Sequence, residues 1–123
     1  CALPILTGGI YTFDVFGVNE GVALVNGNGE RLELKFWSSG LADQVYLALR
    51  LALAKVFSYQ VESLPIILDD ILVRFDENRQ RSALELLAEI GKNQQIWLFT
   101  CQRSVFDMAQ FVTGIDCHRL SRN

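Results

Sequence analysis

Hydrophobic and polar positions divide the chain into a β-rich first third and a longer region in which helices and strands alternate. Residues 9–16 and 21–25 are rich in Val, Ile, Tyr, Phe and Leu, which favour strands. The Asn-Gly-Asn-Gly run at 26–29 predicts a hairpin turn, because both residue types tolerate positive φ. Residues 31–37 alternate apolar and charged side chains, so we expect a half-buried strand there.

After residue 38 the pattern changes to that of an α/β protein. Residues 40–59 predict a long helix with apolar residues nearly all round, which we expect to be buried on several sides. The short apolar run at 64–68 predicts a buried parallel strand. A second helix is expected over 77–90, where Gly91 is suited to stop it.

The last quarter of the chain continues the alternation. We expect a buried strand at 96–100, a short helix at 105–111 and a last strand at 117–120. Parallel strands between helices form a layered α/β fold, in which ligands bind at the carboxyl ends of the strands. Asp69, Asp70, Cys101 and Gln102 follow two such strands, so this edge is the expected site of chemistry.

Composition excludes several classes of protein. Half of the residues are hydrophobic and 20% are charged, which argues against disorder, and the net charge of -3 argues against a broad basic face for DNA. The three cysteines form no CxxC pair, so we expect neither a disulfide framework nor a zinc site. This cysteine usage is typical of a protein in the reducing cytoplasm. The longest apolar stretch, 45–57, contains Arg50 and Lys55, so no membrane span is expected.

Two adjacent acids suggest a cation site. Asp69 and Asp70 end the apolar run at 64–68, and Mg²⁺ prefers one or two carboxylates together with waters and phosphate oxygens. The second acid can orient or deprotonate a water molecule. The alternative is a helix N-cap or a solvated loop, and the pair alone does not decide between them.

Two further segments and one cysteine are candidates for chemistry. Ser38, Ser39 and Gly40 precede the long helix, whose first N–H groups favour an anion such as phosphate; the alternative is an ordinary serine N-cap. Gln102 can reach a ligand held at the acids, or lie in water as a loop residue. Cys101 lacks the neighbouring His that a cysteine nucleophile usually needs, since the chain has one His, at 118.

The order of these segments resembles one family. Residues 37–53, Trp-Ser-Ser-Gly-Leu-Ala-Asp-Gln-Val-Tyr-Leu-Ala-Leu-Arg-Leu-Ala-Leu, resemble the signature motif and helix of ATP-binding-cassette ATPases, nearest the YhaN-like, SbcC-like and RecN-like branch. Residues 65–70 resemble its Walker B strand, 75–79 its D-loop and 99–102 the strand before its switch residue. The resemblance covers roughly residues 8–120 and implies the C-terminal half of a P-loop NTPase head of SMC-like type.

The resemblance implies a nucleotide site shared by two heads. Ser38 and Gly40 would contact the γ-phosphate of ATP bound by a second head in a head-to-head homodimer, with Ser39 in the same motif. Asp76 would cross the dimer interface in the D-loop.

The resemblance also implies a metal and a base. Asp69 would hold the Mg²⁺ that accompanies ATP. Asp70 stands where most members have a catalytic Glu, and its side chain is one methylene shorter. Gln102 stands where a switch His is usual; it can donate a hydrogen bond but cannot take up a proton.

No G-x-x-x-x-G-K-[ST] phosphate-binding loop occurs in the sequence. The family places that Walker A loop in an N-terminal lobe beyond a long coiled coil. The chain starts at Cys1, so we expect a piece of a longer protein: one partial domain over 1–123, with a β-rich part at 9–37 and an α/β part at 38–123.

The main hypothesis is therefore an ATP-hydrolysing half-site that acts on DNA, in repair or chromosome maintenance, once a Walker A lobe completes it. The DNA target is implied by the resemblance alone. One alternative is a non-catalytic, degenerate head that serves as a protein-interaction module. Another is an independent Mg²⁺ phosphohydrolase built on Asp69 and Asp70, which leaves Ser38 to Gly40 and Gln102 unexplained.

Overall fold

The computed structural model describes residues 9, 11–15, 22–60 and 63–121. The chain divides into two compact units, Cys1–Val61 (unit 1) and Glu62–Asn123 (unit 2). Among the described residues, unit 1 contains the antiparallel strands and one long helix, whereas unit 2 contains two parallel strands and two shorter helices.

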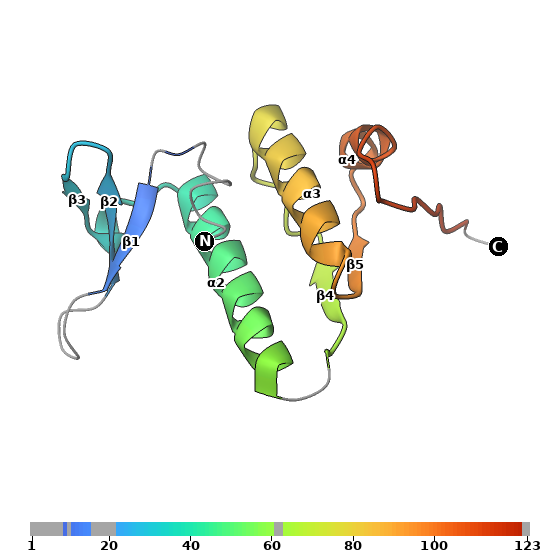
Figure 1. The fold of residues 1–123 in the computed structure, drawn as a ribbon. Coiled ribbons are helices and arrows are strands. Elements are labelled where there is room, and N and C mark those ends of the chain that lie inside the picture. Colours follow the sequence, from blue (N-terminus) through green and yellow to red (C-terminus); the bar gives the residue numbers. More distant parts are fainter. Residues whose placement is uncertain (1–8, 10, 16–21, 61–62, 122–123) are drawn as a thin grey trace. The chain divides into compact units, whose positions relative to one another are not determined.

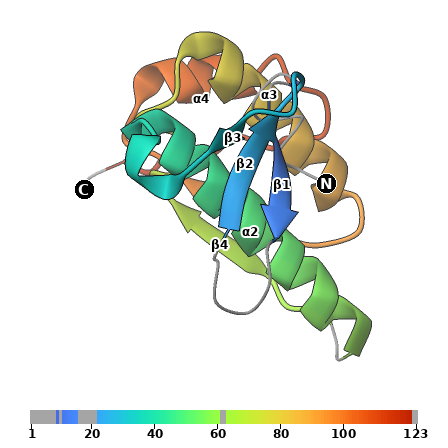
Figure 2. The ribbon, with the colours of Figure 1, turned by 90° about the vertical axis from the view of Figure 1, so that its left-hand side faces the viewer.

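Unit 1 begins with an antiparallel sheet in the order β1-β2-β3 (Figures 1 and 2). Its strands are β1 (Tyr11–Val15), β2 (Val22–Asn26) and β3 (Arg31–Leu32). The two predicted strands before the turn are confirmed, although residues 10, 16 and 21 of those predictions lie outside the described residues.

The turn between β2 and β3 is held by one asparagine side chain. Asn26 Oδ1 accepts hydrogen bonds from the backbone N–H groups of Asn28 at 3.0 Å and Glu30 at 2.9 Å. Gly29 adopts φ +79°, a backbone conformation that residues other than glycine rarely adopt. The predicted hairpin turn is thus confirmed, and its glycine is used where the backbone requires it.

The strand predicted over 31–37 is wrong beyond Leu32. Leu34–Phe36 forms the 3₁₀ turn η1, in which Leu34 and Phe36 are 67% and 65% exposed. The indole Nε1 of Trp37 donates to the carbonyl oxygen of Leu32 at 3.0 Å, occupying an acceptor that a continuing strand would use for pairing. The alternating pattern therefore does not mark a buried face here.

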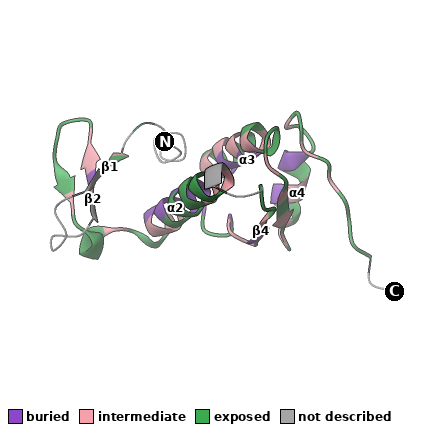
Figure 3. Cartoon of the chain, turned by 60° about the horizontal axis from the view of Figure 1, so that its bottom comes forward, coloured by how far each residue is buried: buried purple, intermediate pink, exposed green. Residues whose placement is uncertain are grey.

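The long helix α2 (Ser39–Gln60) confirms the helix predicted over 40–59, but not its burial on several sides. One stripe of α2 is buried, and another is exposed, as Figure 3 shows. The exposed stripe contains Leu49, Leu53, Val56 and Phe57. None of the helices in the described part of the chain combines the length and hydropathy that crossing a membrane requires.

Unit 2 is built on two parallel strands, β4 (Ile66–Asp69) and β5 (Ile96–Phe99), joined through α3 (Glu77–Gly91). The helix α4 (Arg103–Ala109) follows β5. This β-α-β-α order confirms the predicted α/β fold, and parallel strands require such a crossover helix.

Two details at the ends of elements in unit 2 differ from the predictions. No strand forms over residues 117–120, which lack an assigned helix or strand. Gly91 is the last residue of α3 and Lys92 is its C-cap in αR conformation, so Gly91 does not stop the helix through a left-handed turn. Residues 117–120, Cys-His-Arg-Leu, lack a described neighbouring strand with which to pair.

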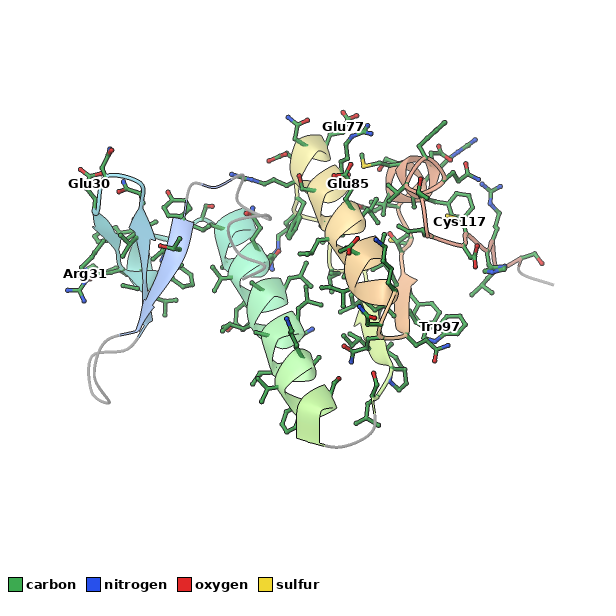
Figure 4. All side chains as sticks on the ribbon, in the orientation of Figure 1. Glu30, Arg31, Glu77, Glu85, Trp97 and Cys117 are labelled. Atoms are coloured by element: carbon green, nitrogen blue, oxygen red, sulfur yellow. The ribbon has the colours of Figure 1, made fainter. Side chains whose placement is uncertain are left out.

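The sheet of unit 2 has one buried and one exposed face. Leu68 and, on the helices, Leu84 and Val105 are almost completely buried. Ile67 and Trp97, which are register partners, are 68% and 49% exposed. Figure 4 shows Trp97 projecting from β5 away from α3. The candidate site lies where these strands end.

Candidate functional site

The carboxyl ends of β4 and β5 bring the two predicted acids next to the segment 100–102. Asp69 pairs with Phe99 in the parallel register, and the backbone N–H of Asp70 donates to the carbonyl oxygen of Phe99 at 2.8 Å. Asp69 is exposed, and no other described residue hydrogen-bonds its carboxylate. Residues 31 positions apart thus meet at one sheet edge, as predicted from the strand order.

Asp70 is held by two side chains from the end of β5. Thr100 Oγ1 donates to Asp70 Oδ1 at 3.0 Å, and Cys101 Sγ donates to Asp70 Oδ2 at 2.9 Å. Asp70 has φ +48°, in the left-handed region that few residues other than glycine adopt. Non-glycine residues in this conformation concentrate at functional sites, because surrounding contacts must maintain them.

These contacts change the acidity of both partners. The hydrogen bond from Cys101, followed by that from Thr100, lowers the pKa of the Asp70 carboxyl below its usual value. The same hydrogen bond and the charge of Asp70 raise the pKa of the Cys101 thiol. Asp70 is therefore an anion at neutral pH, and Cys101 is a thiol with little nucleophilic character. The sequence-based argument against a cysteine nucleophile agrees with this chemistry.

Gln102 is oriented by a residue that the sequence analysis did not select. Gln80 on α3 is 7% exposed, and its Nε2 donates to the carbonyl oxygen of Leu72 at 3.1 Å and to Gln102 Oε1 at 3.4 Å. This leaves the Nε2 group of Gln102 available as a donor to a ligand. The signal was present, since Gln80 begins the i, i+3, i+4, i+7 stripe of α3 whose other members are apolar.

Asp76 caps α3. Its Oδ1 accepts from the backbone N–H of Arg79 at 3.0 Å, and its Oδ2 lies 3.2 Å from Arg79 Nη1. The side chain of Asp76 is nevertheless 54% exposed. A role in a dimer interface, which the resemblance implies, would come in addition to this local role.

The signature segment lies in unit 1, whereas the acids, Asp76 and Gln102 lie in unit 2. Ser38 Oγ accepts a hydrogen bond from the backbone N–H of Leu41 at 3.2 Å. This is the ordinary serine N-cap, which the sequence offered as the alternative to an anion site. Ser38 and Ser39 are exposed and Gly40 is half-buried. The cap uses one lone pair of the Ser38 hydroxyl and leaves its proton available to an anion.

The acids fit a Mg²⁺ ion that takes most of its ligands from elsewhere. No group of three or more Cys, His, Asp or Glu residues suited to hold a metal occurs in the described part of the chain. Mg²⁺ bound with a nucleotide needs only one or two protein carboxylates, because waters and phosphate oxygens complete its shell. Asp69, exposed and unpaired among the described residues, matches that requirement.

Comparison with known proteins shows a similarity in sequence and a similarity in structure. No protein-family model matches the chain. Over 106 residues the chain is 32% identical to the uncharacterized protein YhaN of Bacillus subtilis (strain 168), which covers 85% of this chain and 11% of YhaN. The SMC head domain from Thermotoga maritima matches with a TM-score of 0.65 and 21% identity, covering 89% of this chain and 38% of that chain.

The chain has the fold of part of an SMC head domain. The resemblance derived from the sequence is confirmed, as is the P-loop NTPase class of the fold. This head segment corresponds to a small part of YhaN and to less than half of the SMC head. Its catalytic and binding residues remain predictions that rest on the geometry described above.

Proposed function

We propose that this head segment supplies one half of a composite ATP-hydrolysing site. The observation that carries the proposal is the edge of unit 2, where Asp69 and Asp70, at the end of β4, lie next to Thr100 to Gln102, which follow β5. Carboxylates and amide donors at the carboxyl end of a parallel sheet suit a bound nucleotide. The likeness to an SMC head supports ATP as that nucleotide.

The residues of this edge have separable roles in the proposed reaction. Asp69 holds Mg²⁺, which would neutralise charge on the phosphates of ATP. Asp70 orients the attacking water with its ionised carboxylate, and the free Nε2 group of Gln102 donates to a phosphate oxygen. Because hydrogen bonds stabilise the charged form of Asp70, it is a weak base, and we expect slow turnover.

The remaining parts of the proposed site come from elsewhere. Ser38, Ser39 and Gly40 would contact the γ-phosphate of ATP bound by a second head, and Asp76 would contact that head directly. A Walker A lobe, on the same or another chain, would bind the remaining phosphates. We propose that the assembled protein acts on DNA in the cytoplasm, as its resemblance to SMC-like ATPases implies.

A second candidate is a non-catalytic head that binds partners without hydrolysing ATP. One observation favours it: both carboxylate oxygens of Asp70 already accept hydrogen bonds, which limits what remains for a water molecule. Gln102, which cannot accept a proton as His can, points in the same direction.

The deciding experiment measures Mg²⁺-dependent ATP hydrolysis by the full-length protein. We expect Asp69→Ala to lower the rate at least about 100-fold, since a lost metal ligand removes several kcal/mol of transition-state stabilisation. Asp116→Ala is the matched control, because Asp116 is exposed and follows α4. An unchanged rate in Asp69→Ala would disprove the metal assignment, and an inactive wild-type protein would favour the non-catalytic head.

A further inference from the structure

The carboxylate of Asp70 is constrained more than a loop acid needs to be. Its main-chain N–H donates a hydrogen bond to the carbonyl oxygen of Phe99, and each of its two carboxylate oxygens accepts a hydrogen bond from a different side chain. Acids next to a strand end usually complete their hydrogen bonds with water. Here two consecutive residues that directly follow β5 provide the donors.

Thr100 links this acid to the Gln102 backbone. Its Oγ1 accepts from the backbone N–H of Gln102 at 3.1 Å while it donates to Asp70 Oδ1 at 3.0 Å. A hydroxyl has one proton, so the bond from Gln102 directs that proton toward Asp70. The backbone N–H of Gln102 thus donates to Thr100, and Thr100 donates to Asp70. This chain of hydrogen bonds connects Asp70 and Gln102, the two predicted catalytic residues.

Cys101 completes the arrangement without contributing to a core. Its side chain is exposed, so burial of apolar surface does not account for its position. Its thiol donates to Asp70 Oδ2 at 2.9 Å, on the oxygen that Thr100 leaves free. Together the two donors define the plane of the carboxylate.

We propose that Thr100 and Cys101 are positioning residues that hold the Asp70 carboxylate in the orientation needed to direct a water molecule. The proposal rests on the proposed function for its catalytic consequence. Rotation of an unrestrained aspartate carboxylate about its Cβ–Cγ bond changes the direction in which its oxygens point, and so displaces a water that it holds. Two donors that remove this freedom lower the cost of orienting that water.

The kinetic test uses paired variants of the full-length protein. Thr100→Val and Cys101→Ala remove the donors, and we expect each to lower kcat for ATP about tenfold with KM unchanged, as loss of a hydrogen bond to a charged group implies. Thr100→Ser keeps the hydroxyl donor and Cys101→Ser replaces the thiol donor with a hydroxyl, so both should retain most of kcat. Thr113→Val, at an exposed threonine, is the control. Equal kcat values in Thr100→Val and wild type would overturn the proposal.

A chemical test reads the contact without ATP hydrolysis. In the absence of Mg²⁺ and nucleotide, iodoacetamide labelling is followed at each cysteine by mass spectrometry, with Cys117 as the internal reference. Asp70→Asn removes the charge that contributes to raising the pKa of the Cys101 thiol, so we expect Cys101 to be labelled several-fold faster relative to Cys117. An unchanged ratio would overturn the contact. If Asp70→Asn changes the labelling ratio as expected but the wild-type protein does not hydrolyse ATP, the contact stands and the proposed function is overturned.

Discussion

Replacement of Asp76 separates a local structural role from a role in a dimer interface. Asp76 is the N-cap of α3: Oδ1 accepts from the backbone N–H of Arg79 at 3.0 Å, and its own carbonyl accepts from the N–H of Gln80 at 2.8 Å. Asp76→Ala removes the side-chain cap and leaves the N–H of Arg79 without that acceptor. Loss of an N-cap costs about 1 kcal/mol.

The ion pair between Asp76 and Arg79 adds little to this cost. The two side chains are 54% and 38% exposed, and exposed pairs contribute roughly 0.2–1 kcal/mol at most. Asp76→Asn keeps a cap oxygen and loses only the charge, so its cost should be a few tenths of a kcal/mol. The two variants therefore differ by roughly 1 kcal/mol, which changes a local opening equilibrium about fivefold.

Hydrogen exchange of the full-length protein, read by mass spectrometry over the first turns of α3, measures this difference. We expect about fivefold faster exchange in Asp76→Ala and nearly wild-type exchange in Asp76→Asn. Glu89→Ala, in the last turn of α3 and far from the cap, is the control. Unchanged exchange in Asp76→Ala, or equal exchange in the two variants, would refute the capping argument. If Asp76 also contacts a second head, Asp76→Asn should weaken ATP-dependent dimerisation, measured by sedimentation, without faster exchange.

Two further predictions concern the stability of unit 2, each measured as a change in urea-induced unfolding followed by a probe in this unit. Leu84 is 1% exposed, so Leu84→Ala should lower the free energy of unfolding by about 2–5 kcal/mol. Val73→Ala, at a side chain that is 50% exposed, should lower it far less. Similar losses in the two variants would contradict the assignment of Leu84 to the core. Asp70→Gly and Asp70→Ala both lose the carboxylate, but glycine tolerates φ +48°. The free energy of unfolding of the glycine variant should therefore be higher by about 1 kcal/mol. Equal values would show that the left-handed conformation is not maintained.

Local patterns were sufficient where one segment controls its own structure. The Asn-Gly-Asn-Gly turn was predictable, because the Asn26 side chain and the positive φ of Gly29 stabilise it through interactions within the turn itself. The strand predicted over 31–37 failed because alternation describes only a preference. There, the Trp37 indole binds the Leu32 carbonyl and the chain bends into η1.

The sequence by itself determined the α/β class, the order of the elements of unit 2 from β4 to α4 and the acids at the end of β4, because apolar runs and their polar ends are local properties. It did not determine that Thr100 and Cys101 hold Asp70, or that Gln80 orients Gln102. Those contacts join residues 22 to 31 positions apart. Only the parallel pairing of β4 with β5, and the return of the chain through α3, brings such donors within hydrogen-bonding distance of their acceptors.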